Sequence, residues 1–200
     1  MAVLYTTVAK EAHAEQIIEK SRFIAHIKPV SNREEAEAFI ALKKKEYKDA
    51  THNVPVFVIG DKMQLQWGSD DGEPQGTSAA PVVQMLVKEG ITNVCLVITR
   101  YFGGIKLGTG GLVRAYTGSA RLALEASGVI EVRDFEELSA DIPYNLLDVI
   151  RNYEKDMPFE ISGLEYSDVI KITLRFESEN RDSVENLLSE LTKGNFQKKV

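Results

Sequence analysis

Hydrophobic and polar positions along this chain alternate in short runs that switch between the periods of strands and of helices. Apolar runs rich in Val and Ile, bounded by polar turns, are typical of buried strands. In the first part of the chain these runs predict strands at residues 3–9, 16–18, 22–27, 54–59, 63–67, 94–99 and 129–132. Helices are predicted after caps at residues 31–32 and 77–78, the second continuing to residue 89, and over residues 112–126.

The first predicted helix has the clearest boundary signals. Ser31 or Asn32 can cap its amino end, acidic residues fill its first turn, and lysines 43–45 lie near its end. This order of charges suits the helix dipole. Ala36, Phe39 and Ile40 follow helical spacing, so the predicted helix has a largely apolar stripe.

The pattern starts again after residue 135. Strands are predicted at residues 138–142, 160–166, 169–176 and 196–200, and helices at 146–153 and 181–192. The order β-α-β-β-α-β over this length is typical of a ferredoxin-like fold. We therefore predict an α+β protein of two domains, residues 1–135 and 136–200.

Composition is that of a globular chain that can build a core, and the charge is unevenly distributed. Of the 200 residues, 44% are hydrophobic and 27% charged, and the net charge of −6 disfavours bulk attraction to nucleic acid or anionic membranes. The first 135 residues carry 16 basic and 16 acidic side chains, whereas the remainder carry 8 and 14. A nucleic-acid-binding face is therefore expected in the first domain, where residues 87–121 hold five basic side chains and one acidic side chain.

The single cysteine and the absence of a long apolar run indicate where in the cell the protein is expected. Cys95 lies inside a predicted buried strand and is expected to be a small core residue, with no internal disulfide. The amino end lacks a basic-plus-apolar signal segment, and no apolar run approaches the ~20 residues of a membrane span. We expect a cytoplasmic protein with no membrane partner.

A glycine-rich segment, residues 103–111, has the sequence GGIKLGTGG and contains five of the 14 glycines. It joins a predicted buried strand to a predicted helix, so backbone amides at the helix start can face an anion. The segment lacks the residues of a Walker A loop and of a dinucleotide-binding fingerprint. The predicted phosphate- or RNA-binding residues are Arg100, Gly103, Gly104, Lys106, Gly108, Gly110, Gly111, Arg114 and Arg121. The alternative is that the glycines only form a tight crossover against the sheet.

Two neighbouring features extend this hypothesis. Arg114, Gly118 and Arg121 lie on one side of the predicted helix, a small and basic face that a phosphate backbone could approach. Tyr101 and Phe102 could stack on bases, or they could belong to the core.

An acidic loop, residues 70–73, offers a second set of candidate residues. Its carboxylates, Asp70, Asp71 and Glu73, could bind a hard metal ion, but their spacing does not match a calcium loop, and no metal or cofactor is predicted. A turn with pairing to Arg100 or Lys106 is the other interpretation. His52 could meet Asp70 or Glu73 as an acid–base pair, so His52, Asp70, Asp71 and Glu73 are the catalytic candidates. His13 and His26 carry no partner signal.

Several stretches resemble the IMPACT/YigZ family. They are DDGEPQGT at residues 70–77, TNV at 92–94, TRYFGGIKLGTGGLVRAY at 99–116, KSRFIA at 20–25 and THN at 51–53. The chain departs from the family at Val54-Pro55, where Cys-Trp or a similar pair is common, so it has no thiol at that position. The resemblance extends over the whole chain, because bacterial YigZ-like members also carry a small C-terminal α/β domain.

The resemblance implies particular folds and a role in translation. The first domain would be like the second domain of ribosomal protein S5, a two-layer α/β sandwich. The second would be like domain V of elongation factor G. Both folds occur in proteins that contact RNA or the ribosome, and eukaryotic members of the family act in translational control.

We therefore expect a cytoplasmic, translation-linked regulatory or binding protein that contacts RNA or a ribosomal component through the basic, glycine-rich segment. A possible protein partner stays open. The first alternative is a hydrolase, for example a peptidase-like one, that acts on a small substrate with His52 and the acidic loop. The second is a regulator that interacts with proteins only. Whether the chain is an enzyme is left open, with a binding function as the leading interpretation.

Overall fold

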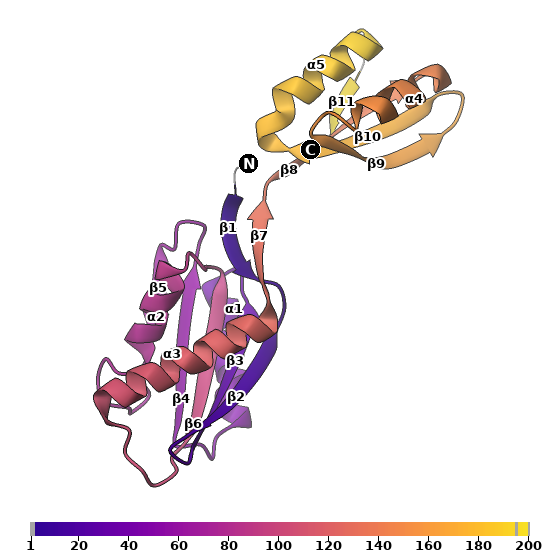
Figure 1. Ribbon diagram of the computed structural model, residues 1–200. Coiled ribbons are helices and arrows are strands. Elements are labelled where there is room, and N and C mark those ends of the chain that lie inside the picture. Colours follow the sequence, from indigo (N-terminus) through magenta and orange to yellow (C-terminus); the bar gives the residue numbers. More distant parts are fainter. Residues whose placement is uncertain (1–2, 195, 200) are drawn as a thin grey trace. The chain divides into compact units, whose positions relative to one another are not determined.

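The computed structural model describes residues 3–194 and 196–199. The described residues divide into two compact units, one formed by Leu4–Val132 and the other by Val3 with residues 133–194 and 196–199 (Figure 1). In the part of the chain that the structure describes, no helix combines the length and the apolar character needed to cross a membrane.

The first unit is built on a five-stranded antiparallel sheet with the order β2-β3-β6-β4-β5. In that order the strands are β2 (Ala12–Ile18), β3 (Ser21–Pro29), β6 (Val94–Tyr101), β4 (His52–Ile59) and β5 (Leu65–Gly68). The central strands β6 and β4 are buried along almost their whole length, as their unbroken apolar runs predicted. The predicted strands of this sheet are all present.

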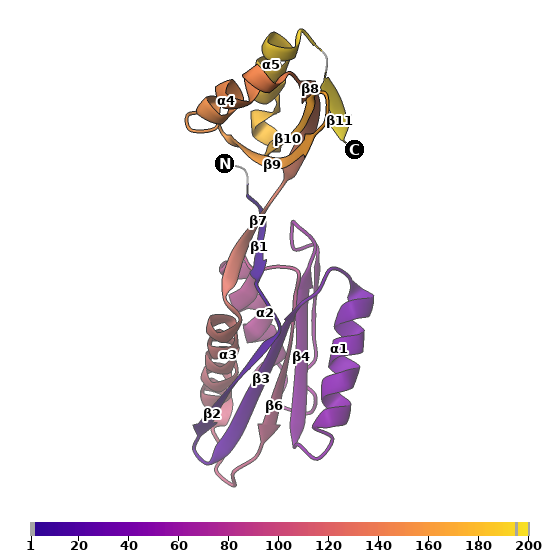
Figure 2. The same ribbon diagram turned by 90° about the vertical axis from the view of Figure 1, so that its right-hand side faces the viewer.

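Helices cover both faces of this sheet (Figure 2). Helices α2 (Ala79–Lys88) and α3 (Gly108–Ser127) pack on one face, and α1 (Arg33–Glu46) packs on the other. A hydrophobic core lies on each face of the sheet, and alternate residues of β4 contribute to one core or the other. Val56 belongs to the core beneath α2 and α3, and Phe57 to the core beneath α1. The unit therefore has three layers, unlike the two-layer sandwich that the resemblance implied, because both faces of β4 and β6 are apolar.

The helix starts show how local polar groups set the boundaries. The predicted cap of α1 is confirmed: Asn32 Oδ1 accepts a hydrogen bond from the Glu35 amide at 2.9 Å. Helix α2 is capped by a residue outside it, since Asp70 Oδ1 accepts from the amides of Ser78 and Ala79. Helix α3 begins at Gly108, four residues before the predicted start, so the second half of the glycine-rich segment forms its first turn. The low helix propensity of glycine concealed that turn in the sequence.

Strands β1 (Val3–Val8) and β7 (Val129–Arg133) form a separate two-stranded sheet. Both strands were predicted. The Thr92 amide donates to the Thr6 carbonyl at 2.9 Å, and the Ala9 amide donates to the Gly128 carbonyl at the same distance. These bonds fasten the start of the chain to the first unit.

The second unit has the predicted order of elements. They are β8 (Phe135–Ile142), α4 (Tyr144–Tyr153), β9 (Phe159–Tyr166), β10 (Ile170–Glu177), the short 3-10 helix η1 (Ser178–Asn180), α5 (Arg181–Thr192) and β11 (Phe196–Lys199). The four strands form an antiparallel sheet with the order β11-β8-β10-β9. Residues such as Ile142, Ile172 and Phe176 alternate onto one face and form the core with α4 and α5.

Candidate functional site

A cavity of about 440 Å³ lies in the first unit where several predicted site residues meet. It combines the start of β4, the end of β6, the acidic loop and the glycine-rich segment with the first turn of α3. The lining residues are Thr51, His52, Gly72, Glu73, Pro74, Arg100, Phe102, Lys106, Leu107, Gly108, Thr109 and Leu112. Its volume is within the range of small-molecule sites.

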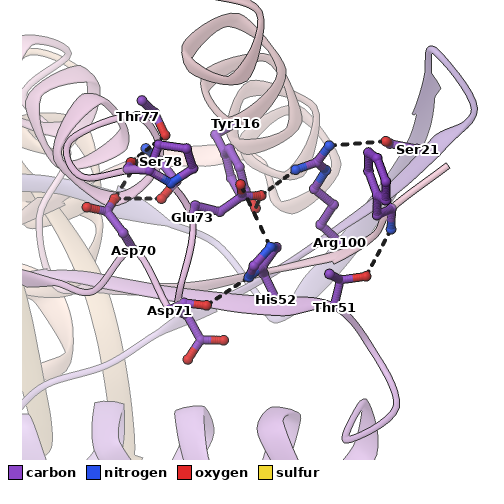
Figure 3. A network of polar contacts seen from close by, with 12 residues as sticks. Ser21, Thr51, His52, Asp70, Asp71, Glu73, Thr77, Ser78, Arg100 and Tyr116 are labelled. Carbon is purple, nitrogen blue, oxygen red and sulfur yellow. Dashed lines mark hydrogen bonds and ion pairs between the residues drawn. The ribbon is translucent and has the colours of Figure 1, made fainter. Parts of the chain in front are cut away.

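Glu73 is the centre of a buried polar network beside this cavity (Figure 3). Its Oε1 accepts hydrogen bonds from Arg100 Nη1 and from the Tyr116 hydroxyl, both at 2.7 Å. The Glu73 and Arg100 side chains are only 3% and 6% exposed. Burial, followed by the nearby Glu73 carboxylate, raises the pKa of Tyr116, so its hydroxyl keeps its proton and acts as a donor. The carboxylate is thus held in one orientation.

Arg100 supports this network and is not a free cation. Its Nη2 donates to Ser21 Oγ at 3.3 Å, and its guanidinium carbon lies 5.4 Å from the ring centroids of both Phe23 and Phe102. Within the described residues its Nε has no hydrogen-bond partner. Arg100 was predicted from the sequence to bind phosphate, but it forms the other predicted arrangement, an ion pair with the acidic loop, because a buried Glu73 needs a compensating charge.

His52 reaches Glu73, as one sequence interpretation proposed. His52 Nδ1 lies 2.8 Å from the carbonyl oxygen of Asp71, which can only accept, so Nδ1 carries a proton. His52 Nε2 lies 3.8 Å from Glu73 Oε2. In the neutral ring this Nε2 is therefore a hydrogen-bond acceptor beside the carboxylate.

The other two carboxylates of the acidic loop have structural partners. Asp70 accepts from the Ser78 hydroxyl at 2.6 Å and from the Gly76 amide at 2.8 Å. Burial acts to raise the pKa of Asp70, but the hydrogen bonds from Ser78 and from backbone amides outweigh it and lower that pKa. Asp71 binds the Asn53 amide at 2.7 Å and Lys44 at 2.6 Å. Among the described residues no group of three or more His, Cys, Asp or Glu side chains is arranged to hold a metal ion.

The glycines of the glycine-rich segment have different roles. Gly103 is required by close packing, because a Cβ there would lie 2.0 Å from the Lys20 carbonyl carbon. Gly104 and Gly108 have φ values of +87° and +71°, which favour glycine. Gly110 and Gly111 lie in the first turn of α3. The tight-crossover interpretation therefore explains part of the segment, and Gly108 also lines the cavity.

The predicted cations fall into two groups. Lys106 and Arg114 are exposed, and the described residues include no ion pair with either side chain. Lys106 lines the cavity, and Arg114 lies on α3. Arg121 pairs with Glu89 and lines a different hollow, so the structure does not bring it to the cavity.

Phe102 was an ambiguous candidate in the sequence, and the structure leaves it 46% exposed at the cavity. Its amide donates to Thr51 Oγ1 at 3.0 Å, which fixes the backbone beneath the ring. Residue-level reasoning missed the supporting roles of Ser21, Thr51 and Tyr116. All three lie within the stretches that carry the family resemblance, and that signal could have identified them.

The fold and the site together define a two-unit α+β protein with a cavity at a glycine-rich segment. The chain belongs to the IMPACT family. The family model described as the Impact N-terminal domain matches residues 19–124, and a domain of unknown function, DUF1949, matches residues 141–195.

Relatives and a solved structure agree with this assignment. The chain is 38% identical over 190 residues to the IMPACT family member YvyE of Bacillus subtilis (strain 168), covering 95% of this chain and 88% of the relative. It is 44% identical over 110 residues to the IMPACT family member YigZ of Escherichia coli (strain K12), covering 54% of this chain and 53% of the relative. A crystal structure described as that of a hypothetical protein has 29% identity and a TM-score of 0.62 over 96% of this chain and 95% of the other.

Proposed function

We propose that this protein is a cytoplasmic, translation-linked binding protein that holds a phosphate of an RNA at the rim of the cavity. The observation that carries the proposal is the position of Lys106, an exposed and unpaired cation beside the first turn of α3. The amino end of a helix carries a partial positive charge and unsatisfied amides, which suit phosphate oxygens. The link to translation comes from the family, whose eukaryotic members act in translational control.

The charge around the cavity supports an anionic ligand. Glu73 is compensated by Arg100, and Asp71 by Lys44. Asp70 is held by the Ser78 hydroxyl and by backbone amides and does not line the cavity. Lys106, the helix end and the exposed Arg114 remain as positive groups. The local field thus favours phosphate although the whole chain has a net charge of −6.

We propose different binding roles for domains 1–135 and 136–200. The order β11-β8-β10-β9 with two helices on one face supports a ferredoxin-like fold for the second domain, like domain V of elongation factor G. We infer that the first domain is related to the second domain of ribosomal protein S5, with α1 on the other face of the sheet as an addition to that two-layer sandwich. Since residues 136–200 carry 8 basic and 14 acidic side chains, we assign them to docking a protein partner and not to RNA.

The test is a salt titration of RNA binding, measured by fluorescence anisotropy with a labelled uridine decamer. Affinity is expected to fall between about 50 and 200 mM salt, and Lys106→Gln should reduce the magnitude of the salt slope by about 0.7, the value of one phosphate contact on a single strand. Arg114→Gln should act in the same direction. Lys62→Gln is the matched control, because Lys62 is exposed and follows the opposite end of β4. Binding that is insensitive to salt would refute the proposal.

A hydrolase is the second candidate, and the observation that favours it is the His52 Nε2 atom 3.8 Å from Glu73 Oε2 in the cavity. Such a pair can activate a water molecule as a general base. Under this alternative His52→Ala abolishes turnover of a small ester or peptide substrate while Lys106→Gln leaves it intact. Binding of a protein partner without RNA, unaffected by either change, would instead support a regulator that acts through proteins only.

A further inference from the structure

We propose that the cavity binds one unpaired guanosine phosphate, with its base against Phe102 and its phosphate at Lys106. The proposal rests on the proposed RNA-binding function and names the nucleotide that the site takes. Three features of the cavity carry it: an exposed aromatic ring, a pair of hydrogen-bond acceptors, and a positive rim.

The exposed ring is a stacking surface that is held in place. Phe102 is 46% exposed and lines the cavity. Thr51 Oγ1 accepts a hydrogen bond from its amide, and the Arg100 guanidinium lies 5.4 Å from its ring centroid. A ring fixed in this way offers its remaining exposed surface to a base, because stacking needs little further ordering.

The pair of acceptors lies on the polar side of the same cavity. Glu73 Oε2 and His52 Nε2 are 3.8 Å apart, and both residues line the cavity. Arg100 and Tyr116 engage the other oxygen of Glu73, and the Asp71 carbonyl engages the other nitrogen of His52. With the His52 ring neutral, Glu73 Oε2 and His52 Nε2 are therefore the two atoms of this pair left to accept from a ligand that has two adjacent donors.

Guanine is the base that satisfies this pair. Its Watson–Crick edge has N1–H and the N2 amino group next to each other, whereas adenine, cytosine and uracil have no two adjacent donors on that edge. An ammonium or guanidinium group would also satisfy two acceptors, but Lys106 and the amino end of α3 disfavour a cation in this cavity. A ligand with adjacent donors and a negative phosphate fits both features.

The guanosine could be part of an RNA or a free nucleotide, and the test separates these sources. Anisotropy is measured with labelled uridine decamers that contain one central guanosine, inosine or adenosine, and with guanosine monophosphate as competitor. Inosine lacks only the N2 amino group. The guanosine decamer should bind about tenfold more tightly than the inosine decamer, because without the N2 amino group one acceptor of the pair is left unpaired. The adenosine decamer, which lacks both donors, should bind no more tightly than the inosine decamer. Guanosine monophosphate should displace the guanosine decamer.

Variants test whether the preference for guanosine arises in the cavity. His52→Gln should bring the guanosine-to-inosine ratio close to one, whereas the control His13→Gln, at an exposed position, should keep it. Phe102→Leu should weaken binding of the guanosine and adenosine decamers alike by about tenfold, the effect of one stacked base. Phe135→Leu, at an exposed aromatic residue of the second unit, is its control.

The outcomes separate this proposal from the one on which it rests. Equal affinity for all three decamers, or an unchanged ratio in His52→Gln, would overturn guanine recognition and leave RNA binding in place. Guanosine monophosphate binding without binding of any decamer would support the guanosine site and overturn the RNA function. If neither ligand binds, both proposals are wrong.

Discussion

Replacement of Arg100 by methionine tests whether the network around Glu73 is the structural support of the site. Glu73 is 3% exposed in its side chain and has two donors on Oε1, of which Arg100→Met removes the charged one. Methionine fills much of the same space but leaves the buried carboxylate with the Tyr116 hydroxyl on Oε1 and with His52 Nε2 3.8 Å from Oε2. Breaking a buried ion pair from one side costs about 3–5 kcal/mol, a large part of the ~5–15 kcal/mol that stabilises a typical domain.

The assay is urea unfolding followed by fluorescence of Trp67, the only tryptophan, which stacks on Phe57 at 5.3 Å between centroids. We expect the double variant Glu73→Gln with Arg100→Met to be at least about 2 kcal/mol more stable than the sum of the single effects predicts, because no charge is left unpaired. Arg22→Met is the control, since it breaks an exposed ion pair with Glu15 and should leave the unfolding midpoint unchanged.

Two results would refute this reasoning. A loss below about 1 kcal/mol in Arg100→Met would mean that the carboxylate finds water or another donor, as at a surface site. Additive effects of the two substitutions would mean that Glu73 and Arg100 do not interact energetically. Either result would remove the argument that Glu73 Oε2 is held in a fixed direction toward the cavity.

Two further predictions concern other parts of the first unit. Burial, aided by Lys43, lowers the pKa of His26 from 6.5 to about 4. Because the unfolded chain then binds the proton more strongly, the free energy of unfolding should fall by up to ~3 kcal/mol as pH falls from about 6.5 to 4. In urea unfolding, His26→Phe should lack this pH-dependent loss of stability. In the glycine-rich segment, Gly103→Ala forces a Cβ into the Lys20 backbone and should destabilise the protein by about 1–3 kcal/mol. Gly110→Ala, in the exposed first turn of α3, should be neutral or stabilise by up to ~1 kcal/mol. Equal effects of the two substitutions in thermal unfolding would contradict the packing role of Gly103.

Much of the fold could be predicted from the sequence because its apolar runs are bounded by clear turn residues. The helix at residues 181–192 has the predicted bounds, and the cap at Asn32 was one of two predicted. The start of α3 was missed, since a helix that begins with three glycines in four residues has no propensity signal. The third layer, formed by α1, was missed because a continuous apolar run in a strand does not indicate which helix covers each face of the sheet.

The candidate site could be predicted in part. The neighbourhood of His52, the acidic loop and the glycine-rich segment was proposed from the sequence, and the cavity brings these together. The burial of Arg100 could not be predicted, because charged residues are rarely buried unless a partner is known. Tyr116 lies 43 residues from Glu73, so only the packing of α3 on the sheet brings its hydroxyl to the carboxylate.

Ultraviolet crosslinking of a bound guanosine-containing decamer, with the attached peptide identified by mass spectrometry, tests the location of the ligand most directly. The account predicts crosslinks on the peptide that holds Phe102 and Lys106, and their loss when Phe102→Leu and Lys106→Gln are combined. Crosslinks confined to residues 136–200, or an unchanged pattern in the double variant, would contradict it.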